Sequence, residues 1–257
     1  MAATIIAIAN QKGGVGKTTT AVNLAAAFAL KNRRTLLIDL DPQSNTTLTF
    51  LSPEDITTSV YDVLADHHTS VTEVVRPTKV ANLCLIPAKI SLAKLEANLV
   101  GQFDAPYRLK DALANVRNDF DLIVIDTPPA LGIITVNALV AANYLLVPIQ
   151  ASYYSLEGTD DLLETLERIR ARPNPELQLL GVIVTLFDRR TNLARDTYKQ
   201  VRQVFGARVL GEIVSDERLV MRAVNTGRPF VASQPKSQPA LDVVQLAEGV
   251  WQRHQID

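Results

Sequence analysis

Short runs of apolar and β-branched residues alternate with longer helix-like stretches along almost the whole chain. Most of these runs are apolar throughout, which is typical of parallel strands that are covered on both faces. Because strands and helices alternate, the connections are expected to be right-handed crossovers. The sequence therefore predicts an α/β fold with a mostly parallel, twisted sheet and helices on both faces. The predicted strands are 4–10, 34–40, 82–88, 121–127, 144–150, 179–187 and 208–214, with helices that include 16–31, 107–117, 155–170 and 193–205.

The chain is predicted to form a single domain over residues 1–257. Its 257 residues, 47% of them hydrophobic, suffice for one large core or two small ones. No internal repeat or low-complexity linker divides them, and the Pro/Ser/Gln-rich residues 228–240 are interpreted as a loop before a last helix at about 239–254. That helix is expected to dock on the domain through an apolar stripe. The stripe consists of Leu241, Val244, Ala247 and Trp251.

Residues 10–23, with the sequence NQKGGVGKTTTAVN, link the first predicted strand to a helix. Three glycines leave room for backbone N–H groups to surround phosphate oxygens, and the following helix points its positive N-terminus at the same charge. In this context Lys17 is expected to contact the β- and γ-phosphates and Thr18 to bind Mg²⁺. The alternative is a glycine turn that holds no ligand.

The loop departs from the usual phosphate-binding pattern G-x-x-x-x-G-K-[ST], whose first glycine would fall at Gln11. A second lysine, Lys12, stands next to it, five residues before Lys17. Judged from the residues alone, Lys12 either serves the ligand or extends into solvent, as most lysines do.

Two acidic motifs follow predicted strands. Asp39 and Asp41 lie two residues apart in LLIDLDPQ (36–43), so their side chains leave on the same face. Asp126 ends the apolar run of LIVIDTPP (122–129). Beside a triphosphate, such carboxylates hold Mg²⁺, directly or through water, or orient the attacking water. For Asp39, a structural role as a helix cap or turn former is an equal alternative.

Five motifs in this order resemble those of the ParA/Soj family, the deviant Walker A ATPases of the ParA/MinD group within the SIMIBI class of P-loop NTPases. The resemblance spans nearly the whole chain, and its first motif alone is highly specific. The motifs are KGGVGKTTTAVNLA (12–25), LLIDLDPQSNTT (36–47), IVIDTPPALG (123–132), YYSLEG (153–158) and DRRTNL (188–193).

The resemblance implies a protein that binds ATP and Mg²⁺ and forms a homodimer with nucleotides at its interface. Lys12 matches the family's signature lysine, which reaches the phosphates of the partner's nucleotide and so couples nucleotide state to dimerisation. Asp41 matches the acid that positions the hydrolytic water, and Asp126 matches the Walker B acid. Residues 128–132 match the segment that responds to the γ-phosphate.

The site residues expected on these grounds fall into three groups. The catalytic residues are Lys12, Lys17 and Asp41. The ATP-binding residues are Gln11, Lys12, Gly13, Gly14, Val15, Gly16, Lys17, Thr18 and Thr19, together with Asp188, Val214 and Ser215 around the adenine. The metal-binding residues are Thr18, Asp126 through water and, as the open alternative, Asp39.

Residues 189–208 hold six cations and one acid, a local excess of +5 on a chain whose formal net charge is −1. Such a surface can bind DNA phosphates without recognising the base sequence; the alternative is an ordinary solvated helix face. The resemblance implies binding of nonspecific double-stranded DNA by the ATP dimer. The expected contacts are Arg189, Arg190, Arg195, Lys199, Arg202 and Arg218. Asp216 and Glu217, which depart from the family pattern, are expected to weaken DNA binding or to reshape the edge of the base pocket.

The resemblance predicts a ParA-type ATPase that partitions or positions cargo, such as a plasmid, a chromosome or a protein organelle. Its intrinsic hydrolysis is expected to be slow, because no arginine finger is obvious, and to be stimulated by a ParB-like or other cargo adaptor. A cytoplasmic location is expected, since neither a secretory signal nor an apolar run of about 18 residues is found, and the resemblance implies association with the nucleoid.

Two other classes of protein are alternatives to this prediction. The first is a membrane-associated, MinD-like regulator of division, but no membrane contact is expected because the last helix lacks a polar face rich in lysine and arginine. The second is a small-molecule synthetase. A nitrogenase-type iron protein is excluded, because its iron–sulfur cluster needs paired cysteines and the chain has only Cys84.

Overall fold

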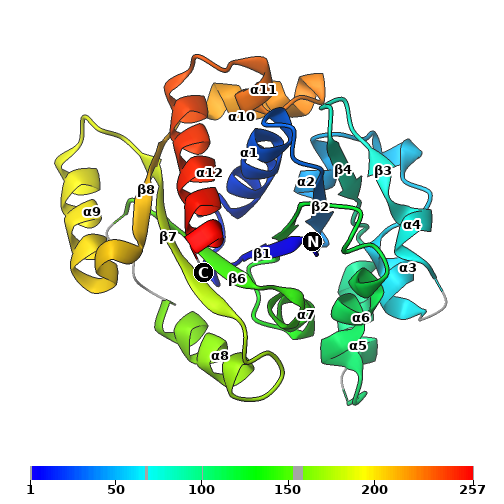
Figure 1. The fold of residues 1–257 in the computed structure, drawn as a ribbon. Helices are drawn as coiled ribbons and strands as arrows, with labels where there is room; N and C mark the ends of the chain where they lie inside the picture. Colours follow the sequence, from blue (N-terminus) through cyan, green and yellow to red (C-terminus); the bar gives the residue numbers. More distant parts are fainter. Residues whose placement is uncertain (1, 67–68, 100, 153–158, 257) are drawn as a thin grey trace.

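The computed structural model describes residues 2–66, 69–99, 101–152 and 159–256 (Figure 1). In these parts of the chain, eight strands form one sheet in the order β3-β4-β2-β5-β1-β6-β7-β8. Neighbouring strands are parallel, except that β3 and β4 are antiparallel. The strands are β1 (Thr4–Ile8), β2 (Thr35–Asp39), β3 (Arg76–Pro77), β4 (Leu83–Ile86), β5 (Leu122–Asp126), β6 (Tyr144–Gln150), β7 (Gln178–Phe187) and β8 (Val209–Val214).

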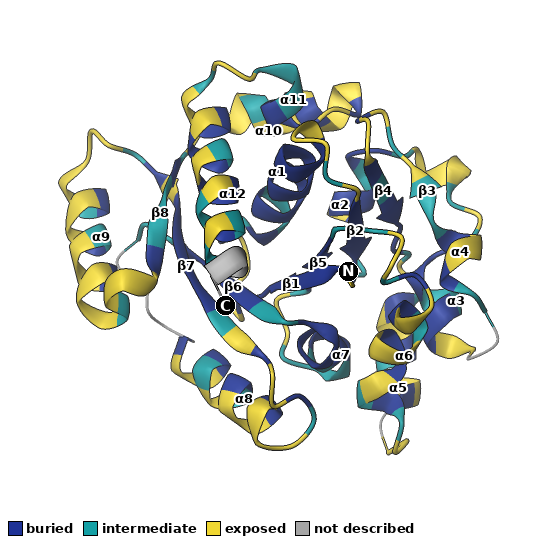
Figure 2. Ribbon diagram, viewed as in Figure 1, coloured by how far each residue is buried: buried dark blue, intermediate teal, exposed yellow. Residues whose placement is uncertain are grey.

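All seven strands predicted from the sequence are present, and the predicted α/β fold with a mostly parallel sheet is confirmed. The central strands are buried on both faces (Figure 2), which explains why their sequences are apolar throughout. The sequence does not predict β3. Its two residues form a short antiparallel edge pair that includes Pro77, and such a pair leaves no periodic signal.

Helices cover both faces of the sheet, and a separate apolar core lies beneath each layer. α1, α11 and α12 pack on one face, and α3 and α5 to α9 pack on the other (Figure 1). α1 is buried almost all round (Figure 2), so the loop in front of it has a fixed support. The helices are α1 (Lys17–Leu30), α2 (Asn45–Leu48), α3 (Val60–Ala65), α4 (Val71–Val74), α5 (Leu92–Leu99), α6 (Arg108–Ala114), α7 (Ile133–Ala141), α8 (Thr159–Ala171), α9 (Asn192–Phe205), α10 (Glu217–Thr226), α11 (Phe230–Ser233) and α12 (Gln238–Ile256).

α12 packs against α1 and β8, but the residues that it buries are not the predicted stripe. Only Ala247 of that stripe is fully buried; Leu241 is 49% exposed, and Val244 and Trp251 are half-buried. Both sets of positions have helical spacing, so only the packing partner decides between them. The buried apolar residues of α12 are Ala240, Val243, Leu246, Ala247 and Val250.

Polar contacts also tie the C-terminal turns of α12 to the rest of the fold. The guanidinium of Arg33 lies 4.0 Å from the centre of the Trp251 ring, a cation–π contact. Arg253 donates to the carbonyl oxygens of Leu180 at 3.0 Å and Ala207 at 2.7 Å. Within the described residues, none of the helices combines the length and the apolar character that a membrane span requires.

Candidate functional site

The segments that follow β1, β2 and β5 meet at the carboxyl ends of these strands. β1 lies between β5 and β6, so the chain leaves β1 where the strand order reverses, which is where open α/β sheets form ligand crevices. Residues 10–16 form the loop at this point. Asp39 of β2 and Asp126 of β5 are register partners at the same edge. The predicted phosphate loop and two of the predicted acids thus lie together.

The loop of residues 10–16 has an open conformation that its glycines permit. Gly14 and Gly16 have φ values of 72° and 82°, in the left-handed region that glycine adopts without strain. Thr185 of β7 donates from Oγ1 to the carbonyl oxygen of Val15 at 2.6 Å and so anchors the loop. Gly16 precedes α1 without a side-chain cap. The first N–H groups of α1 therefore have the unpaired, positive character that attracts anions.

A cavity of about 550 Å³ opens in front of this loop. Its volume is typical of sites for small-molecule ligands and cofactors. The wall combines the glycines of the loop with one lysine, two carboxylates and several apolar side chains. The lining residues are Gly13, Gly14, Gly16, Lys17, Thr18, Thr19, Asp41, Asn45, Pro129, Leu186, Glu217, Val220 and Met221.

Lys17 supplies a buried positive charge to the cavity wall. It is only 7% exposed, and its Nζ donates to the carbonyl oxygen of Lys12 at 3.1 Å. Burial lowers the pKa of Lys17, because the ammonium group loses water, and the charges of Asp126 and Asp41 partly oppose this shift. Phosphate oxygens in the cavity would replace that lost solvation.

Asp126 is fully buried, and its two carboxylate oxygens have different surroundings. Oδ2 accepts hydrogen bonds from Thr18 Oγ1 at 2.8 Å and Thr46 Oγ1 at 2.7 Å. Oδ1 has no hydrogen-bond partner among the described residues, which is costly for a buried carboxylate. Magnesium, a hard cation that prefers oxygen ligands, would satisfy this oxygen.

Thr18 and Asp126 are therefore compatible with the predicted magnesium site. The described residues contain no group of three or more metal-ligating His, Cys, Asp or Glu side chains. Magnesium does not require such a cage, because it usually takes one or two protein ligands and completes its shell with water and phosphates.

Asp39 makes internal hydrogen bonds that favour the structural alternative for this residue. Its Oδ1 accepts from the backbone N–H of Asp41 at 3.0 Å. Its Oδ2 accepts from the backbone N–H of Thr47 at 2.9 Å and from Thr47 Oγ1 at 2.6 Å. Asp39 thus joins the end of β2 to the start of α2 and shapes the turn that carries Asp41.

Burial makes both carboxyl groups of this edge hard to ionise. Burial first, and then the charge of Asp126, raises the pKa of Asp39 to about 8. Burial raises the pKa of Asp126 to about 6, although hydrogen bonds from Thr46 and Thr18 oppose the shift. The folded protein therefore binds more protons at this edge than the unfolded chain does at neutral pH.

The nucleotide-free protein is expected to lose stability as the pH rises from about 4 to about 8. The unfolded chain releases these protons near the ordinary value of 3.8, whereas the folded chain holds them until about pH 6 to 8, so stability falls across this window. Asp126→Asn, which cannot ionise, should reduce the loss by on the order of 1–3 kcal/mol. Urea unfolding in a chelator at about pH 5 and about pH 8 measures it, with Asp111→Asn as the exposed control. An unchanged pH dependence in Asp126→Asn would contradict this expectation.

Asp41 lies in the wall of the cavity and is 8% exposed. Its Oδ1 accepts from the backbone N–H of Gln43 at 3.0 Å, and its carbonyl oxygen accepts from the N–H of Ser44 at 2.8 Å. Ser44, with a φ of 58°, then leads into α2. This tight turn holds the Asp41 carboxylate at the cavity, where it can accept a hydrogen bond from a water molecule.

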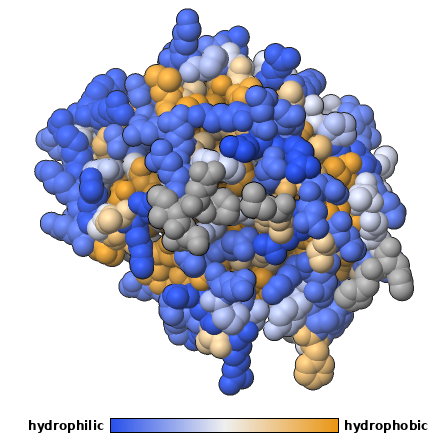
Figure 3. All heavy atoms as spheres, in the orientation of Figure 1, coloured by the Kyte–Doolittle hydropathy of each residue, from blue (hydrophilic) through white to orange (hydrophobic). Residues whose placement is uncertain are grey.

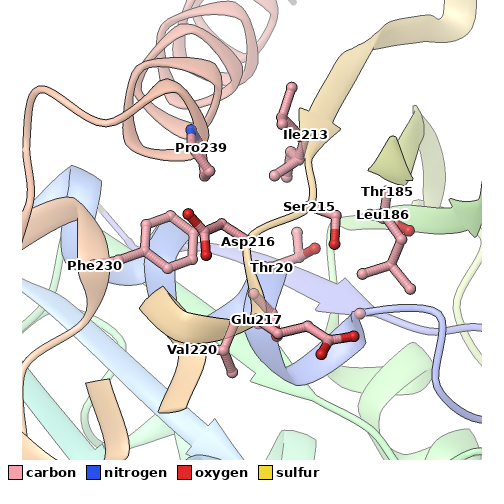
Figure 4. Close-up of a pocket in the computed structure, with 13 residues that line it drawn as sticks. Thr20, Thr185, Leu186, Ile213, Ser215, Asp216, Glu217, Val220, Phe230 and Pro239 are labelled. Carbon is pink, nitrogen blue, oxygen red and sulfur yellow. The ribbon is translucent and has the colours of Figure 1, made fainter. Parts of the chain in front are cut away.

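A smaller slot of about 50 Å³ adjoins the cavity (Figure 4). Its wall is mainly apolar and includes Ile213 of β8, Phe230 of α11 and Pro239 of α12. An apolar slot beside a phosphate loop suits a planar base. The residues that line both spaces are Gly16, Thr19, Leu186, Glu217 and Val220.

The slot contains two of the three residues predicted around an adenine. Val214 and Ser215 line it. Asp188 is not one of its lining residues: its carboxylate accepts from the Arg190 guanidinium at 3.0 and 2.9 Å. This pairing lowers the pKa of Asp188 to about 2.

Comparison with known proteins agrees with this geometry. A family model described as an AAA domain matches residues 3–179. The sporulation initiation inhibitor protein Soj of Bacillus subtilis is 40% identical over 247 residues, which cover 96% of this chain and 97% of Soj. The chromosome partitioning protein ParA of Myxococcus xanthus is 38% identical over 250 residues, covering 97% of this chain and 88% of that ParA.

The chain belongs to the ParA/Soj family of P-loop ATPases.

A solved structure supports the same fold. Cobyrinic acid a,c-diamide synthase from Mycobacterium smegmatis, crystallised with an ATP analogue and magnesium, has a TM-score of 0.86 and 33% sequence identity. The similarity covers 98% of this chain and 96% of the synthase chain. The similarity therefore extends over the phosphate loop, the strand ends that carry Asp39 and Asp126, and the slot.

Lys12, predicted to be the signature lysine of the ParA/Soj family, lies beside the cavity and is not among the residues of its wall. The Nζ of Lys12 is 3.5 Å from Ser152 Oγ, and its backbone N–H donates to Asn10 Oδ1 at 2.9 Å. Gln11 is exposed, whereas Val15 is buried beneath the loop. Lys17 and Lys12 thus have different positions, one in the cavity wall and one beside it.

Most cations predicted to contact DNA form ion pairs on the surface. The pairs are Arg189 with Glu212 and Asp242, Arg190 with Asp188, Lys199 with Asp196, and Arg218 with Asp216. The four basic side chains are between 51% and 91% exposed. Arg195 bonds Asn192 at 2.6 Å, and Arg202 is exposed on α9. Pairs between exposed partners are weak, so phosphates can replace those acids; Asp242, which also pairs with Arg189, is buried. The α9 side of the molecule is largely hydrophilic in Figure 3.

Several residues of the site are not identified by the sequence motifs. Thr46 donates from Oγ1 to Asp126 Oδ2, a role that the sequence analysis does not predict. Leu186 lines both spaces with a φ of 51°, a strained value that clusters at functional sites. Phe230 lies in a segment predicted only as a loop. The motif YYSLEG at 153–158 lies outside the described residues.

Proposed function

We propose that this protein is a magnesium-dependent ATP hydrolase of ParA type that partitions or positions cargo. The observation that carries the proposal is the placement of Lys17 and Thr18 in one cavity wall, with the buried carboxylate of Asp126 bonded to Thr18. This combination provides a cation for the phosphates and oxygen ligands for the metal. The synthase neighbour, which holds an ATP analogue and magnesium, supports ATP and Mg²⁺ as the cofactors.

The hydrolysis step assigns distinct tasks to the side chains. A water oxygen forms a bond to the γ-phosphorus while the bond from that phosphorus to the β–γ bridging oxygen breaks, which releases ADP and phosphate. Asp41 orients the water, and Lys17 stabilises the negative charge of the transferred group. Thr18, and Asp126 through water, would hold magnesium, which would supply positive charge beside the phosphates. The described cavity wall contains no arginine, which supports a slow intrinsic rate that an adaptor increases.

In this proposal Lys12 acts on the nucleotide of a second copy. Its position beside the cavity, rather than in it, supports a contact made across a homodimer interface. The γ-phosphate adds negative charge at that interface, so ATP favours pairing more than ADP does. Whether the protein dimerises then depends on which nucleotide is bound.

The dimer is proposed to bind nonspecific double-stranded DNA of the nucleoid in the cytoplasm, and a ParB-like or other adaptor on the cargo triggers its release. The exposed cations of α9 and its flanks support DNA as the partner. α12 does not support a membrane anchor, because the apolar face from Ala240 to Val250 that packs on α1 and β8 is buried and Arg253 donates to backbone carbonyls.

Co-sedimentation with DNA and with anionic liposomes tests this function. The protein with Mg·ATP is expected to sediment with DNA, to do so less with Mg·ADP, and to lose at least about tenfold in affinity between low and physiological salt. Binding to liposomes instead of DNA would indicate a MinD-like regulator. ATP turnover that needs a small acceptor and ignores DNA would indicate a synthetase.

A further inference from the structure

Glu217 occupies a position that the family motifs do not explain. It is the first residue of α10 and lines both the cavity and the slot. Figure 4 shows its side chain on the side of the slot where Leu186 lies, away from the Phe230 ring. An exposed carboxylate therefore stands where the polar cavity meets the apolar slot.

The connectivity of a nucleotide determines what lies at this boundary. With the phosphates against the loop of residues 10–16 and the base in the slot, the sugar must lie between them, because it joins the two. Five residues line both spaces and so surround the sugar position. Of these five, only Glu217 carries a charge.

Glu217 differs from its neighbour Asp216, which also lines the slot. The Asp216 carboxylate caps α10 by accepting from the backbone N–H of Arg218 at 3.1 Å, and it pairs with the Arg218 guanidinium at 3.3 Å. Within the described part of the chain, neither a hydrogen bond nor an ion pair engages the Glu217 side chain. The Asp216 carboxylate is thus engaged by Arg218, whereas the Glu217 carboxylate is available to a ligand.

We propose that the Glu217 carboxylate accepts hydrogen bonds from the ribose hydroxyls and makes the protein select ribonucleotides over 2′-deoxyribonucleotides. An ionised carboxylate only accepts hydrogen bonds, so it suits hydroxyl groups and not phosphate oxygens. Carboxylates recognise ribose hydroxyls in the same way in other α/β nucleotide sites. The inference rests on the proposed function, in which the cavity and the slot hold one nucleotide.

Calorimetric titration of the full chain with ADP and with 2′-deoxy-ADP, in magnesium, tests the inference without hydrolysis. The wild-type protein is expected to bind ADP about tenfold more tightly than 2′-deoxy-ADP. In Glu217→Ala this ratio should fall to within about twofold, through weaker binding of ADP. Glu217→Gln should keep an intermediate ratio, because its amide oxygen still accepts a hydrogen bond.

Glu176→Ala is the matched control. Glu176 is an exposed acid just before β7, and it lies at the amino ends of the strands, opposite to the site. Its ratio should equal that of the wild type. If the wild type binds ADP and 2′-deoxy-ADP equally, or if Glu217→Ala keeps the wild-type ratio, the inference is wrong and the proposed function stands. If the wild type binds neither nucleotide, the proposed function fails and the inference fails with it.

Discussion

Lys17→Ala is expected to weaken the binding of both ATP and ADP by at least about 100-fold. Lys17 is 7% exposed in the cavity wall, so its ammonium group meets the phosphates in a site that excludes most water. Hydrogen bonds to charged groups are worth about 1.5–3 kcal/mol each, and the alanine variant loses them together with the charge. Equilibrium binding in magnesium measures the effect.

The fold should survive this substitution, because burial already disfavours the charged form of Lys17. The nucleotide-free variant is therefore expected to unfold in one cooperative transition. Lys110→Ala, which removes an exposed lysine of α6, is the control and should bind nucleotides as the wild type does. A Lys17→Ala variant that kept its affinity to within about tenfold would show that the phosphates lie elsewhere.

Lys12→Ala is expected to retain nucleotide binding and to abolish ATP-dependent pairing and hydrolysis. The contacts of Lys12 that shape the loop involve its main chain: its N–H donates to Asn10 Oδ1, and its carbonyl oxygen accepts from Lys17 Nζ. Alanine keeps both groups, so the loop should hold its form. The substitution removes the cation proposed to reach the second copy, together with the side-chain contact to Ser152 Oγ.

Light scattering with Mg·ATP and Mg·ADP, together with phosphate release, separates the two roles. The wild type should double its mass with ATP, whereas Lys12→Ala should remain a monomer with either nucleotide. Lys110→Ala again serves as the control. Formation of an ATP dimer by Lys12→Ala would refute the proposed contact across the interface.

The sequence predicts the central elements of the fold because they are governed by local pattern. Strands buried on both faces must be apolar throughout, so β1, β2 and β5 stand out. The phosphate loop is equally clear, because its glycines occupy left-handed backbone positions that other residues avoid. The position of Lys17 follows from that loop.

Features that depend on tertiary contacts could not be predicted in the same way. Leu241 and Leu246 both suit the apolar face of α12, and only packing against α1 and β8 selects Leu246. Asp188 is predicted to contact an adenine, but its carboxylate accepts a hydrogen bond from the Arg190 guanidinium instead. The charge count over residues 189–208 does not include Glu212, which lies outside that range in the sequence but pairs with Arg189 in the structure.

The two spaces of the site come from different parts of the chain. The groups proposed to act on the phosphates, from Lys12 to Asp126, all precede residue 130, whereas most of the slot is built after residue 184. In the proposed arrangement, substitutions at residues that line only the slot, such as Ile213 or Pro239, would change base preference and leave the reacting groups in place. Thr185 is different, because it lines the slot and also anchors the phosphate loop.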